Sequence, residues 1–132
     1  MKPDQRARKW IAKKAKLGVR SFPVGTIAFY GPDNLRATKV AVGIIPAPQS
    51  ETTALRRWFV ETGDVRKSDT IFAEVAAFLR GHGVHSVAMA DGILGCPHEE
   101  GIDYPEGSTC PDCPYWAGRD RGPASSVRTD AR

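Results

Sequence analysis

The chain of 132 residues contains no long hydrophobic run. Its longest apolar stretch, from Val40 to Pro46, is much shorter than the roughly 18 consecutive apolar residues that predict a membrane-spanning helix. The N-terminus is basic from Lys2 onward but lacks the apolar segment and small-residue cleavage site of a secretory signal. We therefore expect a soluble, cytoplasmic protein without a membrane partner.

Motifs for several common activities are also missing. The sequence has no G-x-x-x-x-G-K-[ST], G-x-G-x-x-G or G-x-S-x-G pattern, so the usual local signals for phosphate cradling and for a serine nucleophile are absent. It has no internal repeat or low-complexity block, which argues against a solenoid. We expect a small domain and favour a binding protein over an enzyme.

Cysteine is scarce, and its distribution is informative. The three cysteines lie within an eighteen-residue segment, and an odd count would leave one thiol unpaired in a disulfide framework. The segment reads C-x-H, eleven residues, then C-x-x-C, a set of three thiolates and one imidazole that suits tetrahedral zinc. The predicted zinc ligands are Cys96, His98, Cys110 and Cys113. His82 or His85 could replace His98, and the alternative to the whole site is three free cysteines with a surface histidine.

The segment between the ligands favours a structural role for the zinc. From Glu99 to Thr109 the sizeable apolar residues are Ile102 and Tyr104, which bury too little area to order the segment. A structural zinc ion contributes folding free energy directly, on the order of 10 kcal/mol in peptides. We expect Tyr115 and Trp116 to pack this zinc lobe against the rest of the protein.

Part of this segment resembles the zinc deaminase signature H-x-E … P-C-x-x-C, with His98, Glu100, Cys110 and Cys113 in the motif positions. The resemblance covers sixteen residues and implies a zinc-bound water with a glutamate as proton carrier. The chain departs from the signature in three ways. Thr109 stands where the signature has proline, and the spacing between Glu100 and Cys110 is short. Cys96 can also occupy the metal position that the water would need. A hydrolase that uses Glu99 or Glu100 as general base is a related alternative.

The remaining sequence predicts a mixed fold. Apolar residues make up 41% and charged residues 26%, as in ordinary globular domains. The runs 26–30 and 38–45, separated by the turn signal at 31–34, predict a β-hairpin. We expect helices over 50–62, begun by a Ser50 cap, and from 68 or 69 to 81, followed by a strand at 84–89 that ends at Asp91-Gly92.

These elements predict an α/β fold that borders on α+β. Its sheet would be small, mixed and three-stranded, with a β-hairpin, a parallel strand after a helical crossover, and the helices on one face. We expect a basic N-terminal arm or helix over 1–20, a single domain over 21–121 that includes a zinc lobe at 95–118, and a disordered tail over 122–132.

Positive charge is concentrated at the N-terminus. Residues 1–20 hold eight basic residues against Asp4, a net charge of +7, whereas residues 96–132 carry a net charge of −3. Such an arm suits attraction to phosphates, with Trp10 available to stack on a base. The candidate nucleic-acid-binding residues are Arg6, Arg8, Lys9, Trp10, Lys13, Lys14 and Lys16, for either RNA or DNA. An equally simple interpretation is a solvated basic helix.

We therefore predict a small, zinc-stabilised, bacterial-type cytoplasmic protein that binds nucleic acid through its basic arm. The segment from Cys96 to Arg121 resembles parts of small bacterial proteins, which implies no particular function. The alternatives are a protein-interaction adaptor with structural zinc and the zinc enzyme described above.

Overall fold

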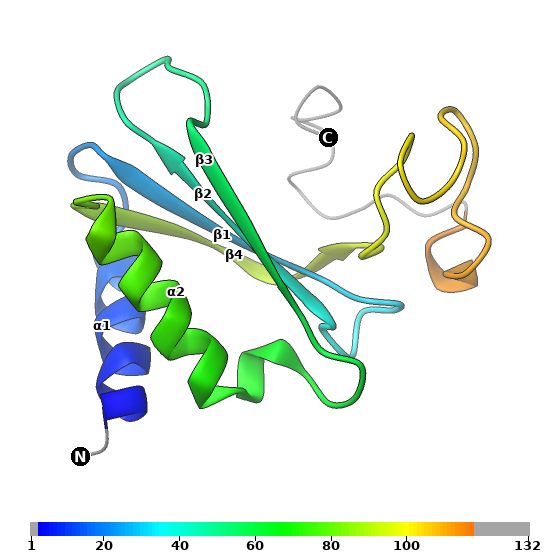
Figure 1. Ribbon diagram of the computed structural model, residues 1–132, viewed down its shortest axis with the longest axis horizontal. Coiled ribbons are helices and arrows are strands. Elements are labelled where there is room, and N and C mark those ends of the chain that lie inside the picture. Colours follow the sequence, from blue (N-terminus) through cyan, green and yellow to red (C-terminus); the bar gives the residue numbers. More distant parts are fainter. Residues whose placement is uncertain (1–2, 118–132) are drawn as a thin grey trace.

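Two helices and a four-stranded sheet make up the computed structural model, which describes residues 3–117 (Figure 1). The expected tail at 122–132, together with residues 118–121, lies outside the described residues. In chain order the elements are α1 (Pro3–Leu17), β1 (Val24–Tyr30), β2 (Lys39–Ile45), β3 (Ala54–Phe59), the short 3₁₀ helix η1 (Val65–Lys67), α2 (Asp69–Gly81), β4 (Ser86–Gly95) and the 3₁₀ helix η2 (Pro114–Trp116).

The sheet is mixed, with strand order β3-β2-β1-β4. β1 and β2 form the expected antiparallel hairpin, in register from Val24 opposite Ile45 to Tyr30 opposite Lys39. β3 is antiparallel to β2, and β4 is parallel to β1. The sheet therefore has four strands rather than the expected three, and the fold is α+β.

The expected helix over 50–62 is wrong, because β3 occupies its centre. Leu55, Trp58 and Phe59 have helical spacing, but Trp58 is buried whereas Leu55 and Phe59 are 51% and 62% exposed on the other face of the sheet. That alternation is typical of a strand. Pairing with β2, which sets Trp58 opposite Val40, overrides the local pattern. Ser50 caps no helix, since its hydroxyl donates to the Glu51 carbonyl.

The second expected helix is confirmed. The Ser68 hydroxyl caps the N-terminus of α2 by accepting from the Ile71 N–H at 3.1 Å. The strand that follows α2 is longer than expected, because β4 continues through Asp91-Gly92 to Gly95. The register with β1 shifts at this point, between the pairs Ile27↔Met89 and Phe29↔Ile93. Because of this irregularity, β4 passes through the turn-like dipeptide and reaches the C-terminal lobe.

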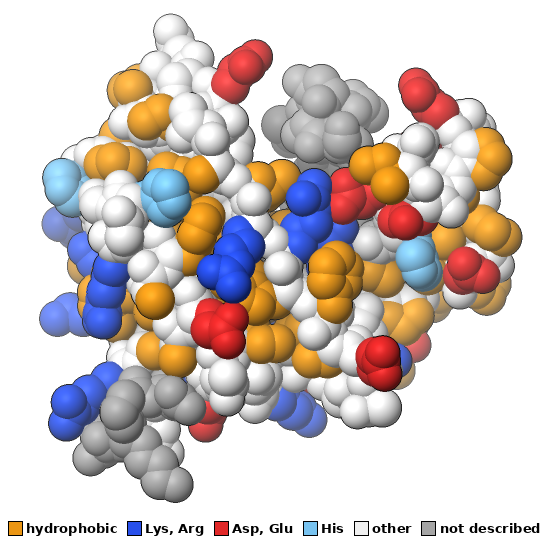
Figure 2. All heavy atoms as spheres, viewed as in Figure 1, with side chains coloured by type: hydrophobic (Ala, Val, Ile, Leu, Met, Phe, Trp, Pro, Cys, Tyr) orange, Lys and Arg blue, Asp and Glu red, His pale blue; other side chains and the backbone are white. Residues whose placement is uncertain are grey.

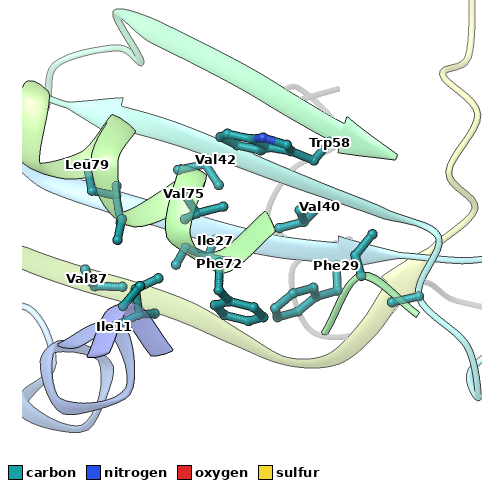
Figure 3. Close-up of a cluster of buried hydrophobic side chains, with 14 of the residues drawn as sticks. Ile11, Ile27, Phe29, Val40, Val42, Trp58, Phe72, Val75, Leu79 and Val87 are labelled. Atoms are coloured by element: carbon teal, nitrogen blue, oxygen red, sulfur yellow. The ribbon is translucent and has the colours of Figure 1, made fainter. Parts of the chain in front are cut away.

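Both helices cover the same face of the sheet (Figure 1), and the hydrophobic core lies between them and the strands (Figure 3). Ile11 of α1 and Leu79 of α2 meet Ile27 and Val42 of the sheet, and each is at most 2% exposed. Gly25 permits the close approach of α2, because a Cβ there would lie 2.3 Å from Leu79 Cδ2. The helices thus leave the opposite face of the sheet uncovered, and Lys39 and Arg57 contact the C-terminal lobe from that face.

The first helix contributes directly to this core. α1 lies within the segment expected to be a basic arm or helix, and its Ala7 and Ile11 are buried against the other elements. Just after α1, the N–H groups of Arg20 and Ser21 both donate to the hydroxyl of Ser86 in β4. The boundary at residue 20 stays a prediction. Among residues 3–117, no helix combines the length and the apolar character that crossing a membrane requires.

Candidate metal centre and basic helix face

The four expected ligands come together at the end of β4. Cys96 directly follows Gly95, the last residue of the strand, and Cys113 directly precedes η2. All three cysteines are buried, with exposed fractions of 2%, 6% and 1%, and His98 is half-buried. Strand pairing with β1 thus fixes the first cysteine, and the returning loop brings back Cys110 and Cys113.

Their donor atoms surround one point. The sulfur atoms of Cys96, Cys110 and Cys113 lie 3.4, 3.4 and 3.5 Å from His98 Nδ1, and all four donor atoms lie within 4.8 Å of one another. Cys96 is as close to the imidazole as the two cysteines of the C-x-x-C pair are. The cluster can therefore hold one metal ion with four protein ligands.

The electrostatics of the cluster favour a cation. Burial raises the pKa of the Cys96 thiol, and burial together with the neighbouring thiols raises the pKa of Cys113 well above its usual range. Three thiolates in one buried cluster are unfavourable in free energy unless a positive charge compensates them. A divalent cation would supply that charge and release protons on binding.

The loop between the ligands is held mainly by its own polar contacts. The Glu99 N–H donates to Asp103 Oδ2 at 2.7 Å, and the Gly107 N–H donates to Glu100 Oε2 at 2.6 Å. Glycines at 101 and 107 adopt positive φ angles of 83° and 85°, which allow the tight turns. The buried cluster of the lobe consists of the three cysteines and Tyr104. So small a core needs a further source of stability.

Long-range contacts attach this lobe (residues 96–117) to the sheet. The Trp116 indole donates from Nε1 to the Gly31 carbonyl at 2.8 Å, as expected of a docking residue. Lys39 Nζ donates to the Pro97 carbonyl at 3.0 Å and to Glu99 Oε2 at 3.1 Å. Arg57 Nε also pairs with Glu99, at 2.7 Å.

Lys39 is one of the junction residues that the sequence did not reveal. It is 4% exposed and lies on the sheet face opposite the helices, with its Nζ over the rings of Tyr30 and Phe59. Burial lowers its pKa, and the bond to Glu99 opposes that shift. The available signal was a lysine at the start of the apolar run 39–45, but its partners are about 60 residues away in sequence.

The glutamates of the enzyme alternative face other partners. Glu99 is paired with Lys39 and Arg57, and Glu100 accepts the Gly107 N–H. The metal cluster found within residues 3–117 includes neither His82 nor His85. These histidines precede β4 whereas Cys96 follows it, a separation of about 30 Å along a ten-residue strand. The local histidine is thus the one that meets the cysteines.

The nucleic-acid-binding candidates of α1 divide into two groups. Three of them make contacts within the protein: Arg8 donates to Asp69 and to the Arg66 carbonyl, Lys14 donates to the His85 carbonyl, and Trp10 packs against the core. The Arg80 guanidinium also lies 4.6 Å from the Trp10 ring centroid. The exposed remainder, defined here as the α1 basic face, is Arg6, Lys9, Lys13 and Lys16.

Comparison with known proteins gave no relative from which a role can be transferred. No family model, curated protein or solved structure matches the chain. The function must therefore be argued from the chemistry of the metal cluster and of the α1 basic face.

Proposed function

We propose that this protein is a zinc-stabilised nucleic-acid-binding protein that contacts phosphates through the α1 basic face. The observation that carries the proposal is the exposure of Arg6, Lys9, Lys13 and Lys16 on one side of a helix whose other side is buried in the core. Their spacing of three, four and three residues repeats the helical period, so the four charges form one stripe. The core holds that stripe in place before any partner arrives.

The distances of the cluster support zinc as the metal. Zinc binds imidazole nitrogen at about 2.0 Å and thiolate sulfur at about 2.3 Å, so a tetrahedral ion separates the two by about 3.6 Å. The observed nitrogen–sulfur distances are 3.4 to 3.5 Å. Four protein ligands close the coordination sphere, which is typical of a structural ion. Zinc would then hold the lobe in shape, and its side chains would carry the docking contacts to Gly31 and Lys39.

Metal analysis tests the zinc part. The chain of 132 residues should contain one zinc ion, and its X-ray absorption spectrum should fit three sulfur ligands and one nitrogen ligand. Cys96→Ser should weaken zinc retention against a chelator by 10-fold or more, because it removes a direct ligand. Ile102→Ala, a change at a side chain that is 77% exposed in the same loop, is the matched control and should retain zinc. An open site with three protein ligands and water would contradict the structural role and restore the enzyme alternative.

Nucleic acid suits the α1 basic face better than a lipid surface does. Insertion of an amphipathic helix requires an exposed apolar side, whereas Ala7 and Ile11 of α1 are already buried in the core. Phosphate recognition needs only the charged side. Anionic vesicles without nucleic acid therefore provide a useful negative control.

Charge substitution tests the nucleic-acid part. Binding of a labelled oligonucleotide should weaken steeply with added salt, and Lys9→Gln/Lys13→Gln should weaken it further. Lys9→Arg/Lys13→Arg keeps the charge at the same positions and should bind like the parent. Substitution is preferable to deletion of residues 1–20, since deletion would also remove the buried Ala7 and Ile11. The proposal fails if the Gln pair binds as tightly as the Arg pair.

The adaptor alternative has one observation in its favour. Leu55 and Phe59 of β3 are 51% and 62% exposed on the side of the sheet that the helices leave open. Binding of a protein there would survive both added salt and the Lys9→Gln/Lys13→Gln change. Such a result would favour the adaptor over nucleic-acid binding.

A further inference from the structure

We infer that the α1 basic face fits the phosphate backbone of double-stranded nucleic acid and binds it without reading base sequence, an inference that rests on the proposed function. Three features support it: the geometry of the stripe, the chemistry of its side chains and the charge of the far end of the molecule.

The stripe is straight and fixed. Lys16 lies ten positions after Arg6, which is about 15 Å along a helix axis, and successive positions of the stripe are offset by about 4.5 to 6 Å along that axis. A duplex is similarly stiff and carries one charge per about 1.7 Å of axis, twice the linear density of a single strand. A rigid row of cations therefore lies near more phosphates on a straight duplex than on a single strand, and the duplex need not bend.

The side chains of the stripe favour phosphates over bases. Three of the four are lysines, whose ammonium groups act as point charges rather than as planar, bidentate partners of a base edge. The aromatic residue of α1, Trp10, packs against the core and lies beside Arg80 and Lys14, so it is not free to stack on an unpaired base. The other exposed positions described in α1 are Gln5, Ala12 and Leu17.

The negative charge of the lobe would orient the protein on a nucleic acid. Residues 96–117 of the lobe contain five carboxylates and no lysine or arginine. Figure 2 shows blue side chains along the left edge, where α1 lies, and several red side chains on the lobe at the right. A polyanion would be attracted to α1 and repelled by the lobe, so contact with a flexible strand would not extend onto the lobe.

Paired titrations test this inference. One labelled 24-nucleotide strand, alone and annealed to its complement, is titrated with the chain of 132 residues from 0.05 to 0.4 M salt. With four phosphate contacts, the logarithm of affinity should fall with the logarithm of salt concentration with a slope of about −3.6 for the duplex and about −2.8 for the strand. If both affinities converge near 1 M salt, the duplex should bind about 6-fold tighter at 0.1 M. Lys9→Gln/Lys13→Gln should halve the duplex slope, and Lys9→Arg/Lys13→Arg should preserve it.

The outcomes separate the two proposals. Tighter binding of the single strand, or a difference above about 10-fold between A·T-rich and G·C-rich duplexes, would overturn the duplex inference and leave nucleic-acid binding intact. Equal loss of binding to both forms in the Gln pair, with the duplex still preferred by the parent, supports both. Binding to anionic vesicles but to neither nucleic acid would overturn both.

Discussion

Asp64 shows how one carboxylate organises the segment between β3 and α2. Its oxygens accept from the Ala37 N–H at 3.1 Å, from the Arg66 N–H at 2.9 Å and twice from the Arg66 guanidinium. The side chain is 8% exposed. The bonds from Arg66 hold the pKa of Asp64 well below its ordinary value of 3.8.

This carboxylate should stabilise the fold only while it is ionised. A folded-state pKa below the unfolded one contributes stability that is present above pH 3.8 and is lost as the pH falls toward the folded value. Asp64→Asn should therefore lower the free energy of unfolding by about 1 to 3 kcal/mol at pH 7. The difference from the parent should shrink below about pH 4, as measured by denaturant titration at both pH values.

An exposed carboxylate provides the control for that experiment. Asp91→Asn lies in β4 on the surface and should change the free energy of unfolding by less than about 0.5 kcal/mol. A parent–variant difference for Asp64→Asn that stays constant down to pH 2 would show that the effect is steric rather than electrostatic.

The residues of the metal cluster were predictable from the sequence, and those that dock the lobe were not. Cys96, His98, Cys110 and Cys113 lie in one short segment, so their spacing alone predicts that they can meet. Lys39 and Gly31 contact the lobe from strands and loops about 60 to 85 residues earlier. Only the sheet order brings them near, and no local pattern carries that information.

At the scale of elements, capping distinguishes the correct helix from the incorrect one. Serine is a preferred N-cap residue, so Ser50 and Ser68 both predicted a helix start. Only Ser68 accepts a backbone N–H there. Ser68→Ala should lower the free energy of unfolding by about 1 kcal/mol. Ser50→Ala is the matched control and should change it by less than about 0.5 kcal/mol, as measured by thermal or denaturant unfolding. Equal costs would show that the Ser68 cap contributes little.

The strand β3 shows why the sequence wrongly predicted a helix over 50–62. Leu55, Trp58 and Phe59 fit a helical period over one turn, and a strand of six residues gives too few alternations to distinguish the two. The edge of β2 decides between helix and strand. Without β3 its backbone groups would be unpaired, and β3 pairs with them along its whole length. The hairpin and α2 were predictable because each carries its own turn or cap signal.

At the scale of the molecule, the main core and the lobe are nearly separate. Within residues 3–117, Trp116 is the one lobe residue that packs against the main core, and the lobe buries only its three cysteines and Tyr104. Removing zinc with a chelator should therefore abolish the amide-exchange protection of residues 96–117 while α2 keeps most of its own. Hydrogen exchange followed by mass spectrometry measures both regions in one sample. Loss of protection in α2 to the same extent would show that the ion stabilises the entire fold, and an unchanged lobe would show that it stabilises neither.

The position of the lobe at the end of β4 has a consequence for biosynthesis. Gly31, Lys39 and Arg57, which receive the lobe, all leave the ribosome well before Cys110 and Cys113 do. The receiving surface can therefore exist before the ligand set is complete. If the lobe holds zinc as proposed, uptake of the ion can only follow the synthesis of Cys113, and without zinc the sheet would form while residues 96–117 stayed unordered.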